Sequence, residues 1–265
     1  MAIGQKAQLR IERKQRHIEQ TRQERREEQY QTLEEVFDKA TLMVLYKLLN
    51  MGLLKHINGV VRAGKESRVY HAVGAEGKNL ALKIYLTISS EFRRGMIPYI
   101  KGDTRFTSVR RDSQGLVYVW AQKEFRNLEK ATVAGVRVPK PVAVEKNVLV
   151  MEFIGEDGAP AVTLKEETPR NPVTMYRLIL TAVRRLYRKA GLVHGDLSEY
   201  NILNVEGHPV FIDMSQSVLL DHPRAEELLE RDLQNVNRFF SKLGVKVREL
   251  GPLFKWVTGH EWEHP

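Results

Sequence analysis

Cysteine is absent from this sequence of 265 residues. Its absence excludes a disulfide framework, a cysteine-based zinc site and a cysteine nucleophile, and it fits a reducing compartment. Long apolar runs are missing as well. No run reaches the ~18 residues that a membrane-spanning helix needs, and the first 20 residues lack the apolar stretch of a secretory signal. We therefore expect a cytoplasmic protein with no membrane partner.

Basic side chains are in excess, with 42 Lys and Arg against 33 Asp and Glu and a net charge of +9. Hydrophobic residues make up 42 %, an ordinary share for a soluble globular protein. The length corresponds to about two domains or lobes. The charge either favours a polyanionic partner such as nucleic acid or contributes only to solubility, and composition alone leaves both interpretations open.

Residues 1–52 are predicted to form an N-terminal helical extension. Residues 1–31 carry eight Lys or Arg, five Glu and few apolar side chains. This composition is typical either of a solvated helix or of a basic arm that binds RNA or a protein. From 32 to 51 apolar residues recur at helical spacing, and Gly52 is suited to end the helix.

The rest of the chain predicts an α+β protein of two lobes with a hinge near 152–155. The first lobe, 53–153, is mostly strand and contains a basic insertion at about 86–118 that we expect to be a flexible loop; the second lobe, 154–265, is mostly helix. Strands are expected near 60–61, 69–73, 80–85, 142–144, 148–153, 202–204 and 210–213, and helices over 119–134, 172–190 and 223–243.

The strongest local signal is the string HGDLSEYN at 194–201, followed by Asp213 at the end of a short apolar run. Transfer of a γ-phosphoryl group asks the protein mainly for positioning and charge neutralisation. Asp196 is suited to orient or deprotonate the acceptor. Asn201 and Asp213 supply the oxygen ligands that Mg²⁺ prefers. The spacing therefore predicts a phosphoryl-transfer site.

A lysine in the first lobe completes such a site. Lys83 stands in the middle of the apolar strand ALKIY, where an ammonium is costly unless it has a partner. Glu124, on the helix expected over 119–134, is the candidate partner, because protein kinases use a Lys–Glu pair of this kind to place the α- and β-phosphates of ATP.

The segment before the lysine strand reads RAGKESRVY and contains one glycine, Gly64. We expect Gly64 and Lys65 to cover the phosphates. The spacing of Gly59, Gly64 and Lys65 also imitates a P-loop. That interpretation fails because Glu66 stands where a Ser or Thr must reach Mg²⁺ and because a strand follows.

Five segments together resemble the RIO family of atypical serine/threonine protein kinases, over about residues 33 to 250. They are GKESRVY at 64–70, LKIY at 82–85, MEFIG at 151–155, HGDLSEYN at 194–201 and IDMSQ at 212–216. The stretch 36–42 resembles the type-1 branch, and the short chain resembles its archaeal members. The resemblance implies a bilobal protein-kinase-like fold, with a β-rich N-lobe and a reduced helical C-lobe.

The resemblance also implies a role for each matching residue. Asp196 and Asp213 are expected to be catalytic, and Asn201 and Asp213 to bind Mg²⁺, with Mn²⁺ as an alternative. The expected ATP-binding residues are Gly64, Lys65, Ser67, Lys83, Glu124, Met151 as gatekeeper, and the backbones of Glu152 and Ile154.

Members of the family are regarded as ATPase switches in maturation of the small ribosomal subunit as much as kinases. The resemblance therefore implies ATP, the pre-ribosomal small subunit and its rRNA as partners. In that scheme the aspartate that matches Asp213 accepts the phosphoryl group, and a carboxylate nucleophile of this kind is chemically reasonable.

Some residues depart from the family pattern. Arg62 replaces a hydroxyl residue near the phosphates, and Met214 and Ser215 follow Asp213 where protein kinases have Phe and Gly. The 52 residues that follow Asp213 are too few for an activation segment and a full peptide-binding lobe. Two other classes stay open: a small-molecule phosphotransferase of the aminoglycoside or choline kinase type, and a non-catalytic RNA-binding scaffold. The basic charge disfavours the first class, and the complete site disfavours the second.

Two further segments give weaker signals. The insertion at 86–118 interleaves aromatic residues with Arg93, Arg94, Arg110 and Arg111, and we expect it to contact RNA, to gate the ATP site or to be a solvated loop. The string HEWEH at 260–264 imitates a zinc motif, but a zinc enzyme needs a third ligand downstream and only Pro265 follows. We interpret it as a solvated tail, and we expect His194 to brace the backbone.

Overall fold

The computed structural model describes residues 37–86, 90–106 and 113–261. These residues divide into two compact units, one formed by 37–57 and 73–77 and the other by 58–72 and the described residues from 78 on. Among the described residues, no helix is both long and apolar enough to cross a membrane.

In the first unit, α2 (Lys39–Asn50) begins where Asp38 caps it. Asp38 accepts hydrogen bonds from the Thr41 amide at 2.9 Å and from the Thr41 hydroxyl at 3.0 Å, a typical N-terminal cap. Gly52, at φ +74°, follows the last turn, as expected. The helix was expected to start at 32, and residues 32–36 lie outside the described part of the chain.

A five-stranded antiparallel sheet has the order β1-β2-β3-β5-β4. Its strands are β1 (Leu54–Ala63), β2 (Ser67–Gly74), β3 (Asn79–Tyr85), β4 (Pro141–Glu145) and β5 (Val148–Glu152). In the register of β3 with β5, Lys83 lies opposite Leu149. All residues of β3 after Asn79 are buried, so Lys83 is held in an apolar sheet.

The insertion contains helix where a loop was expected. The described part forms α3 (Ser90–Ile100), the 3₁₀ turn η2 (Thr104–Phe106) and the first residues of α4 (Ser113–Val133). Met96 and Ile100 are buried with Tyr85 and Trp120 in a small apolar core. The helix predicted from 119 therefore starts earlier, because Leu116 also faces that core.

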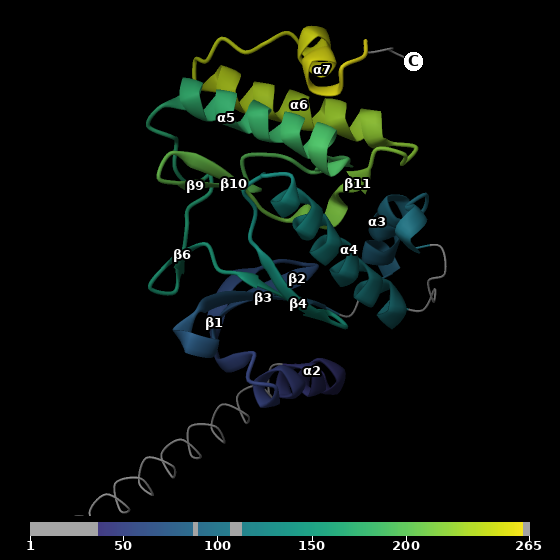
Figure 1. Cartoon of the computed structure of the whole chain (residues 1–265), viewed down its shortest axis with the longest axis vertical. Coiled ribbons are helices and arrows are strands. Elements are labelled where there is room, and N and C mark those ends of the chain that lie inside the picture. Colours follow the sequence, from purple (N-terminus) through teal and green to yellow (C-terminus); the bar gives the residue numbers. More distant parts are fainter. Residues whose placement is uncertain (1–36, 87–89, 107–112, 262–265) are drawn as a thin grey trace, which may run out of the picture. The chain divides into compact units, whose positions relative to one another are not determined.

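The C-terminal part is mostly helical, as expected. Figure 1 shows α5, α6 and α7 near one another, with α4 between them and the sheet. The elements are β6 (Gly155–Glu156), β7 (Ala159–Pro160), α5 (Pro172–Arg185), the π-helical turn η3 (Leu186–Ala190), β8 (Leu192–Val193), β9 (Ile202–Val205), β10 (His208–Phe211), η4 (Met214–Gln216), β11 (Val218–Leu219), α6 (Ala225–Lys242) and α7 (Leu250–Thr258).

One large apolar core joins α4, α5, α6 and α7 to the ends of the sheet strands. Helix α7 was not expected, because glycine and proline stand near its start. Its buried residues Leu253, Phe254 and Val257 account for it, since they recur at helical spacing and enter the core. The lobe boundaries proposed from the sequence, at 52/53 and 153/154, stay a prediction.

Candidate active site

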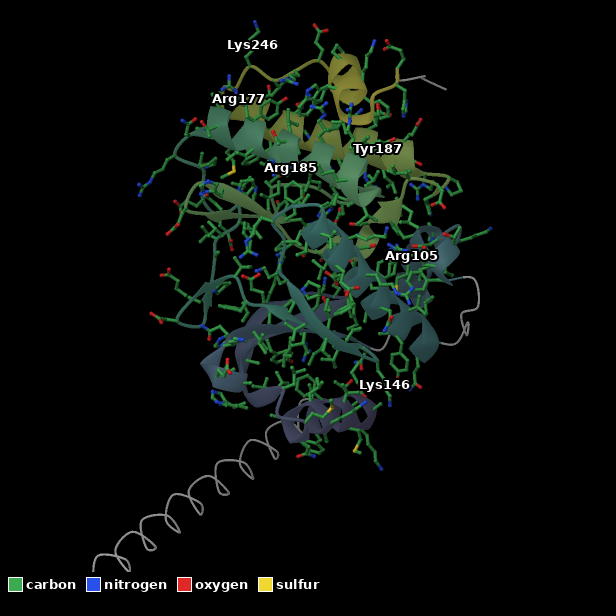
Figure 2. The ribbon with its side chains drawn as sticks, in the orientation of Figure 1. Arg105, Lys146, Arg177, Arg185, Tyr187 and Lys246 are labelled. Atoms are coloured by element: carbon green, nitrogen blue, oxygen red, sulfur yellow. The ribbon has the colours of Figure 1, made fainter. Side chains whose placement is uncertain are left out.

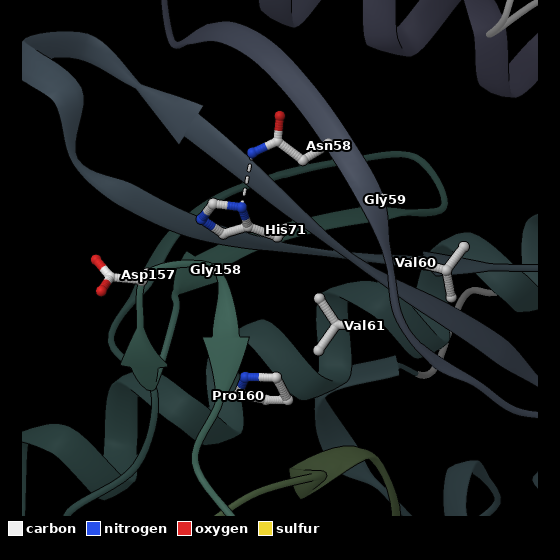
Figure 3. A pocket seen from close by; sticks show the side chains of 8 residues that line it. All are labelled: Asn58, Gly59, Val60, Val61, His71, Asp157, Gly158 and Pro160. Carbon is white, nitrogen blue, oxygen red and sulfur yellow. Dashed lines mark hydrogen bonds between the residues drawn. The ribbon is translucent and has the colours of Figure 1, made fainter.

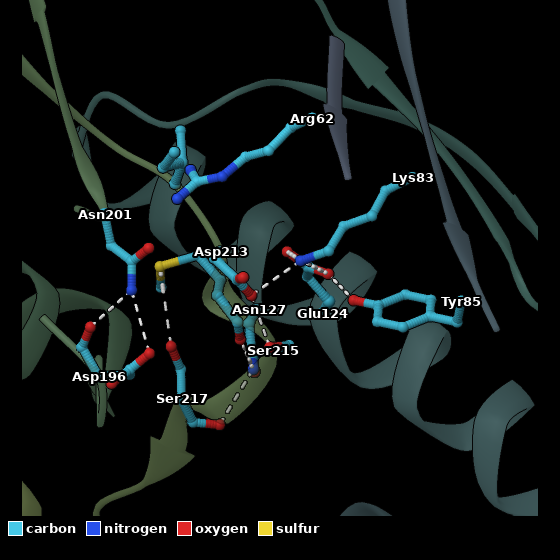
Figure 4. A network of polar contacts seen from close by, with 12 residues as sticks. Arg62, Lys83, Tyr85, Glu124, Asn127, Asp196, Asn201, Asp213, Ser215 and Ser217 are labelled. Carbon is cyan, nitrogen blue, oxygen red and sulfur yellow. Dashed lines mark hydrogen bonds and ion pairs between the residues drawn. The ribbon is translucent and has the colours of Figure 1, made fainter. Parts of the chain in front are cut away.

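Lys83 bridges two carboxylates that come from distant parts of the chain. Its Nζ lies 3.0 Å from Glu124 Oε1 on α4 and 2.8 Å from Asp213 Oδ1 after β10. Lys83 is 5 % exposed and Glu124 is 1 % exposed. Figure 4 shows the lysine between the two carboxylates, with the Tyr85 hydroxyl donating to Glu124. The structure thus brings together the first-lobe lysine, its expected partner and the expected metal ligand.

The charges of this group are strongly coupled. Burial alone would lower the pKa of Lys83, but Asp213 and Glu124 raise it above its ordinary value. The side chain of Asp213 is 41 % exposed, and its partial desolvation opposes ionisation, yet the ammonium of Lys83 and the Ser215 hydroxyl lower its pKa to about 2. Burial raises the pKa of Glu124 to about 7 despite Lys83. The ammonium of Lys83 therefore stabilises the ionised form of Asp213 more than that of Glu124.

Asp213 has an unusual backbone, with φ 60° and ψ 64° in the left-handed region. Such a conformation is uncommon in a non-glycine residue, although aspartate adopts it more often than most, and strained backbone clusters at functional sites. The Ser215 hydroxyl donates to Oδ1 at 2.6 Å, and Lys83 donates to the same oxygen. The side chain is 41 % exposed. These two bonds leave Oδ2 for a metal ion or a phosphoryl group.

The loop at 194–201 brings Asp196 and Asn201 together. Nδ2 of the Asn201 side chain donates to the Asp196 carbonyl at 2.8 Å and to Asp196 Oδ2 at 3.1 Å. The β9–β10 register pairs Ile202 with Phe211, and the Ile212 amide donates to the Asn201 carbonyl at 3.0 Å. The hairpin therefore sets Asn201 beside the segment that carries Asp213.

The pKa of Asp196 is raised by its surroundings. Burial and the nearby Asp213 raise its pKa, while Arg231 and the Asn201 amide lower it less. A raised pKa improves a carboxylate as a general base near neutral pH. The side chain is suited to the acceptor role expected from the sequence.

His194 and Asp232 hold this loop. His194 Nε2 donates to the Ile212 carbonyl at 3.2 Å, and Nδ1 accepts from the Asp196 amide at 3.3 Å, so the expected bracing role is confirmed. Asp232, on α6 and 1 % exposed, accepts the Gly195 and Leu197 amides, each at 2.8 Å. The loop is therefore fixed by its own first residue, His194, and by Asp232 of α6.

The turn between β1 and β2 carries the residues expected at the phosphates. The Gly64 amide donates to the Ser67 carbonyl at 2.9 Å, and Gly64 and Lys65 are exposed. Burial and the charges of Asp213 and Asp196 raise the pKa of Glu66, so this turn lies within electrostatic reach of the Asp213 group. Arg62 donates to the Tyr200 carbonyl at 3.5 Å.

The expected hinge follows β5. Met151 and Ile154 are buried, and Glu152 pairs with Arg137 through two contacts of 2.7 Å. The Glu152 amide donates to the carbonyl of residue 140, and the Ile154 carbonyl accepts from the amide of residue 161. The Glu152 carbonyl and the Ile154 amide are the hinge groups that these two bonds do not use.

A pocket of about 400 Å³ opens beside the hinge, between β1 and the β6–β7 hairpin. Figure 3 shows its lining, which consists of Asn58, Gly59, Val60, Val61, His71, Asp157, Gly158 and Pro160. His71 contacts Asn58 at 2.7 Å, and its ring lies 4.7 Å from that of Phe153 in the hinge. Lys83, Glu124 and Asp213 do not line this pocket.

Sequence reasoning missed three residues that position the site: Lys123, Asn127 and Asp232. Lys123 is fully buried and donates to the Ser215 carbonyl at 2.9 Å, and burial lowers its pKa to about 7. The only available signal was a polar residue on the apolar face of a predicted helix. Such a pattern does not reveal which distant carbonyl or amide it reaches.

The donor set fits Mg²⁺ better than zinc. Among the described residues there is no group of three or more His, Cys, Asp and Glu that could hold a metal ion. Asn201 and Asp213 offer two oxygens, and Mg²⁺ is usually held by one or two protein oxygens together with water and phosphates. Of the HEWEH string only His260 and Glu261 are described, and Glu261 pairs with Lys255.

Comparisons with known proteins identify the family of the chain. The family described as RIO domain matches residues 68–251. A protein of Haloferax volcanii named RIO-type serine/threonine-protein kinase Rio1 is 44 % identical, over 89 % of this chain and 80 % of its own length. The Rio1 protein of Methanocaldococcus jannaschii is 41 % identical, over 88 % and 79 %. The human serine/threonine-protein kinase RIO1 is 40 % identical over 88 % of this chain, which spans only 42 % of the human protein.

A solved structure confirms the expected fold. The Rio2 kinase of Chaetomium thermophilum, in a crystal structure described as its ADP/Mg²⁺-phosphoaspartate complex, has a TM-score of 0.64 to this chain at 25 % identity. The likeness covers 83 % of this chain and 65 % of the other. These matches also decide against the small-molecule phosphotransferase that the sequence left open.

Proposed function

The chain belongs to the RIO family as a RIO1-type serine/threonine kinase, and from this premise we propose that it is an ATP-dependent kinase and ATPase that acts in maturation of the small ribosomal subunit. The observation that carries the catalytic part is the bridge from Lys83 to Glu124 and Asp213. Three charged side chains from β3, α4 and the end of β10 converge there, and phosphoryl transfer needs charges held in this way.

Each expected site residue has a proposed task. Asn201 and Asp213 would hold Mg²⁺, which when bound neutralises charge on the phosphates. The Gly64–Lys65 turn and Ser67 would cover the phosphates. Lys83, oriented by Glu124, would bind the α- and β-phosphates. Figure 4 shows Asp196 and Asn201 on one side of Asp213 and Lys83 on the other.

Adenine would bind at the hinge. Met151 is the proposed gatekeeper, and the Glu152 carbonyl and Ile154 amide would hydrogen-bond the base. The pairing of the Glu152 side chain with Arg137 supports this role, because it keeps that carboxylate turned toward Arg137.

The acceptor of the phosphoryl group can be a protein hydroxyl or Asp213 itself. In the first route Asp196 takes the hydroxyl proton as the oxygen attacks the γ-phosphorus. In the second, Oδ2 of Asp213 forms the new P–O bond, the bond to the ADP oxygen breaks, and water later hydrolyses the acyl phosphate. The pKa of Asp213, lowered to about 2 by Lys83 and Ser215 against the effect of burial, keeps the carboxylate ionised for this attack. The phosphoaspartate described for the Rio2 relative supports the second route.

The ribosomal role rests on charge and on the family. The net charge of +9 suits a polyanionic partner, and we propose pre-ribosomal RNA in the cytoplasm. The segment 172–190, which forms α5 and η3, has five Lys or Arg and no Asp or Glu. The arginines of the insertion that were expected to contact RNA have side chains outside the described part of the chain, so that contact stays a prediction.

A single-turnover reaction with γ-labelled ATP and Mg²⁺ tests the proposal. We expect protein-bound label that hydroxylamine removes and that is absent from Asp213→Asn, because hydroxylamine cleaves acyl phosphates. Label that resists hydroxylamine and is lost in Asp196→Ala would instead indicate phosphorylation of a hydroxyl and overturn the aspartyl-phosphate route. A wild-type protein that neither hydrolyses ATP nor becomes labelled would overturn the catalytic proposal altogether.

A further inference from the structure

A fully buried lysine outside the reaction cycle contacts the turn that follows Asp213. Lys123 is 0 % exposed, and its Nζ donates to the carbonyls of Ser215 and Ser217, the first at 2.9 Å. It also lies 5.3 Å from the centre of the Trp120 ring. A buried ammonium is costly, and it is retained only where its hydrogen bonds compensate. The lysine therefore directs its donors to main-chain oxygens of this turn.

Asn127, one helical turn further along α4, contacts the same segment. Its Nδ2 donates to the Met214 carbonyl at 2.8 Å and to the Ser217 carbonyl at 3.0 Å. Lys123 and Asn127 together hold three carbonyls of the turn Met214–Ser217. Figure 4 shows Asn127 beside this turn. Because this turn begins directly after Asp213, it sets the backbone on which that carboxylate stands.

Arg105, from the insertion, fixes the orientation of Asn127. Its Nη1 donates to Asn127 Oδ1 at 2.9 Å. A guanidinium has no acceptor, so Oδ1 must face Arg105 and Nδ2 must face the turn. Asp103, which is 3 % exposed, holds the guanidinium at 2.9 Å and 2.7 Å. The Asp103–Arg105 pair thereby determines which group of Asn127 meets the carbonyls.

The insertion touches the chain after Asp213 at a second place. The Nδ1 of His222 accepts the Arg224 amide at 3.1 Å, so Nε2 carries the hydrogen that it donates to the Pro98 carbonyl at 3.0 Å. A Cβ at Gly102 would lie 2.9 Å from the Pro223 ring, so the two backbones approach closely. Residues 98–106 therefore contact the segment 214–223 directly at His222 and Pro223, and reach its other end through Asn127.

We propose that residues 98–106, here called the brace, hold the turn Met214–Ser217 so that Asp213 keeps its left-handed backbone and its place beside Lys83. Arg105 and Asn127 are positioning residues in this device. The inference rests on the proposed function, because it assigns these residues to the phosphoryl-transfer site.

The first test measures hydrogen exchange in the nucleotide-free protein. Arg105→Met removes the donors and keeps the length of the side chain. We expect amides of 214–219 to exchange roughly tenfold faster, the effect of losing one charge-assisted hydrogen bond. Arg105→Lys, which retains the positive charge and N–H donors, should restore most of the protection. Arg224→Met is the matched control, because it removes a partly exposed arginine paired with Glu227 and leaves the backbone bond of Arg224 intact.

The second test separates positioning from ATP binding. For Arg105→Met we expect kcat to fall about 10- to 100-fold, with a higher Mg²⁺ concentration for half-maximal rate and little change in KM for ATP, because Lys83 and the hinge are untouched. Asn127→Leu should behave alike, and the double variant should be no worse than the more affected single variant, since both act through one contact. Asn127→Leu carries the test alone if Arg105→Met does not fold.

The outcomes distinguish the two proposals. Unchanged exchange at 214–219 and unchanged kcat in folded Arg105→Met and Asn127→Leu would overturn the brace, even if the wild type transfers phosphoryl groups as proposed. A wild type without phosphoryl transfer would overturn the proposed function, while the exchange measurement would still show whether the brace holds the turn.

Discussion

His194 shows at the scale of one residue how the site depends on protonation. Burial lowers the pKa of His194 to about 4 from 6.5, outweighing the Asp213 carboxylate and the Ile212 carbonyl. Below pH 6.5 the unfolded chain binds a proton at this position that the folded chain does not. The contribution of the neutral His194 to the free energy of unfolding is therefore complete above pH 6.5. It is lost progressively as the pH falls toward 4, because protons then favour the unfolded chain.

We expect this histidine to account for part of the acid sensitivity. Between pH 7.5 and 4.5 the wild type should lose about 2–3 kcal/mol more of its free energy of unfolding than His194→Gln, whose side chain does not titrate. Urea denaturation at the two pH values measures the difference. His208→Gln, at an exposed histidine, should retain the wild-type dependence. If His194→Gln and the wild type lost the same free energy of unfolding between the two pH values, His194 would not be the source of this acid sensitivity.

At the scale of elements, the loop at 194–201 and the turn after Asp213 meet at Gly195. This glycine has φ +80°, and a Cβ there would lie 2.8 Å from the Gln216 carbonyl. The loop can approach the turn so closely only without a side chain. Gly207, in the β9–β10 turn, has φ +81° and open space around its missing Cβ.

The two glycines form a matched pair for mutation. Alanine at either position has a backbone cost of about 1–2 kcal/mol, which thermal or urea unfolding will measure. Only Gly195→Ala should also lower kcat, because it must move either Asp196 or the turn that follows Asp213. If Gly207→Ala impaired catalysis as much as Gly195→Ala, the close approach of loop and turn would not be the cause.

The elements also show what the sequence could and could not predict. Asp196 and Asn201 share one loop, and the strand of Lys83 is uniformly apolar around it, so local patterns revealed the residue types. The contact of Arg105 with Asn127 joins residues 22 positions apart, and that of Lys123 with Ser215 joins residues 92 apart. Their partners are main-chain or amide groups without a sequence signature, and long-range packing alone brings them together. Helix α7 escaped prediction because local propensity at Gly251 and Pro252 opposed the apolar spacing that tertiary packing favours.

At the scale of the whole molecule, the basic charge is unevenly distributed. Figure 2 labels Arg177 and Arg185 on α5 and Lys246 on the segment before α7. All three are exposed. Arg184 and Arg248 lie 4.6 Å and 4.8 Å from the Trp256 ring. The proposed RNA partner should therefore contact this face, formed by α5 and the segment before α7.

Salt dependence of RNA binding tests the location. For Arg177→Glu/Arg185→Glu we expect weaker binding of a single-stranded 20-mer RNA at low salt. We also expect the slope of log affinity against log salt to become shallower by about 2, one for each phosphate that the variant no longer neutralises. Fluorescence anisotropy over a KCl series measures both. Lys55→Glu/Lys130→Glu changes the same charge at exposed residues elsewhere and should leave the slope near that of the wild type. A slope unchanged by the first pair would place the RNA on another surface.

The left-handed backbone of Asp213 also bears on how this fold can evolve. Asparagine and glycine tolerate that conformation, and each is one base away from an aspartate codon. Glutamate is also one base away, but it would keep the charge in a strained backbone and set its carboxylate one carbon further out. A change of Asp213 to asparagine or glycine would therefore remove the proposed phosphoryl acceptor at small cost to the fold, whereas an exchange for glutamate would be the costlier substitution.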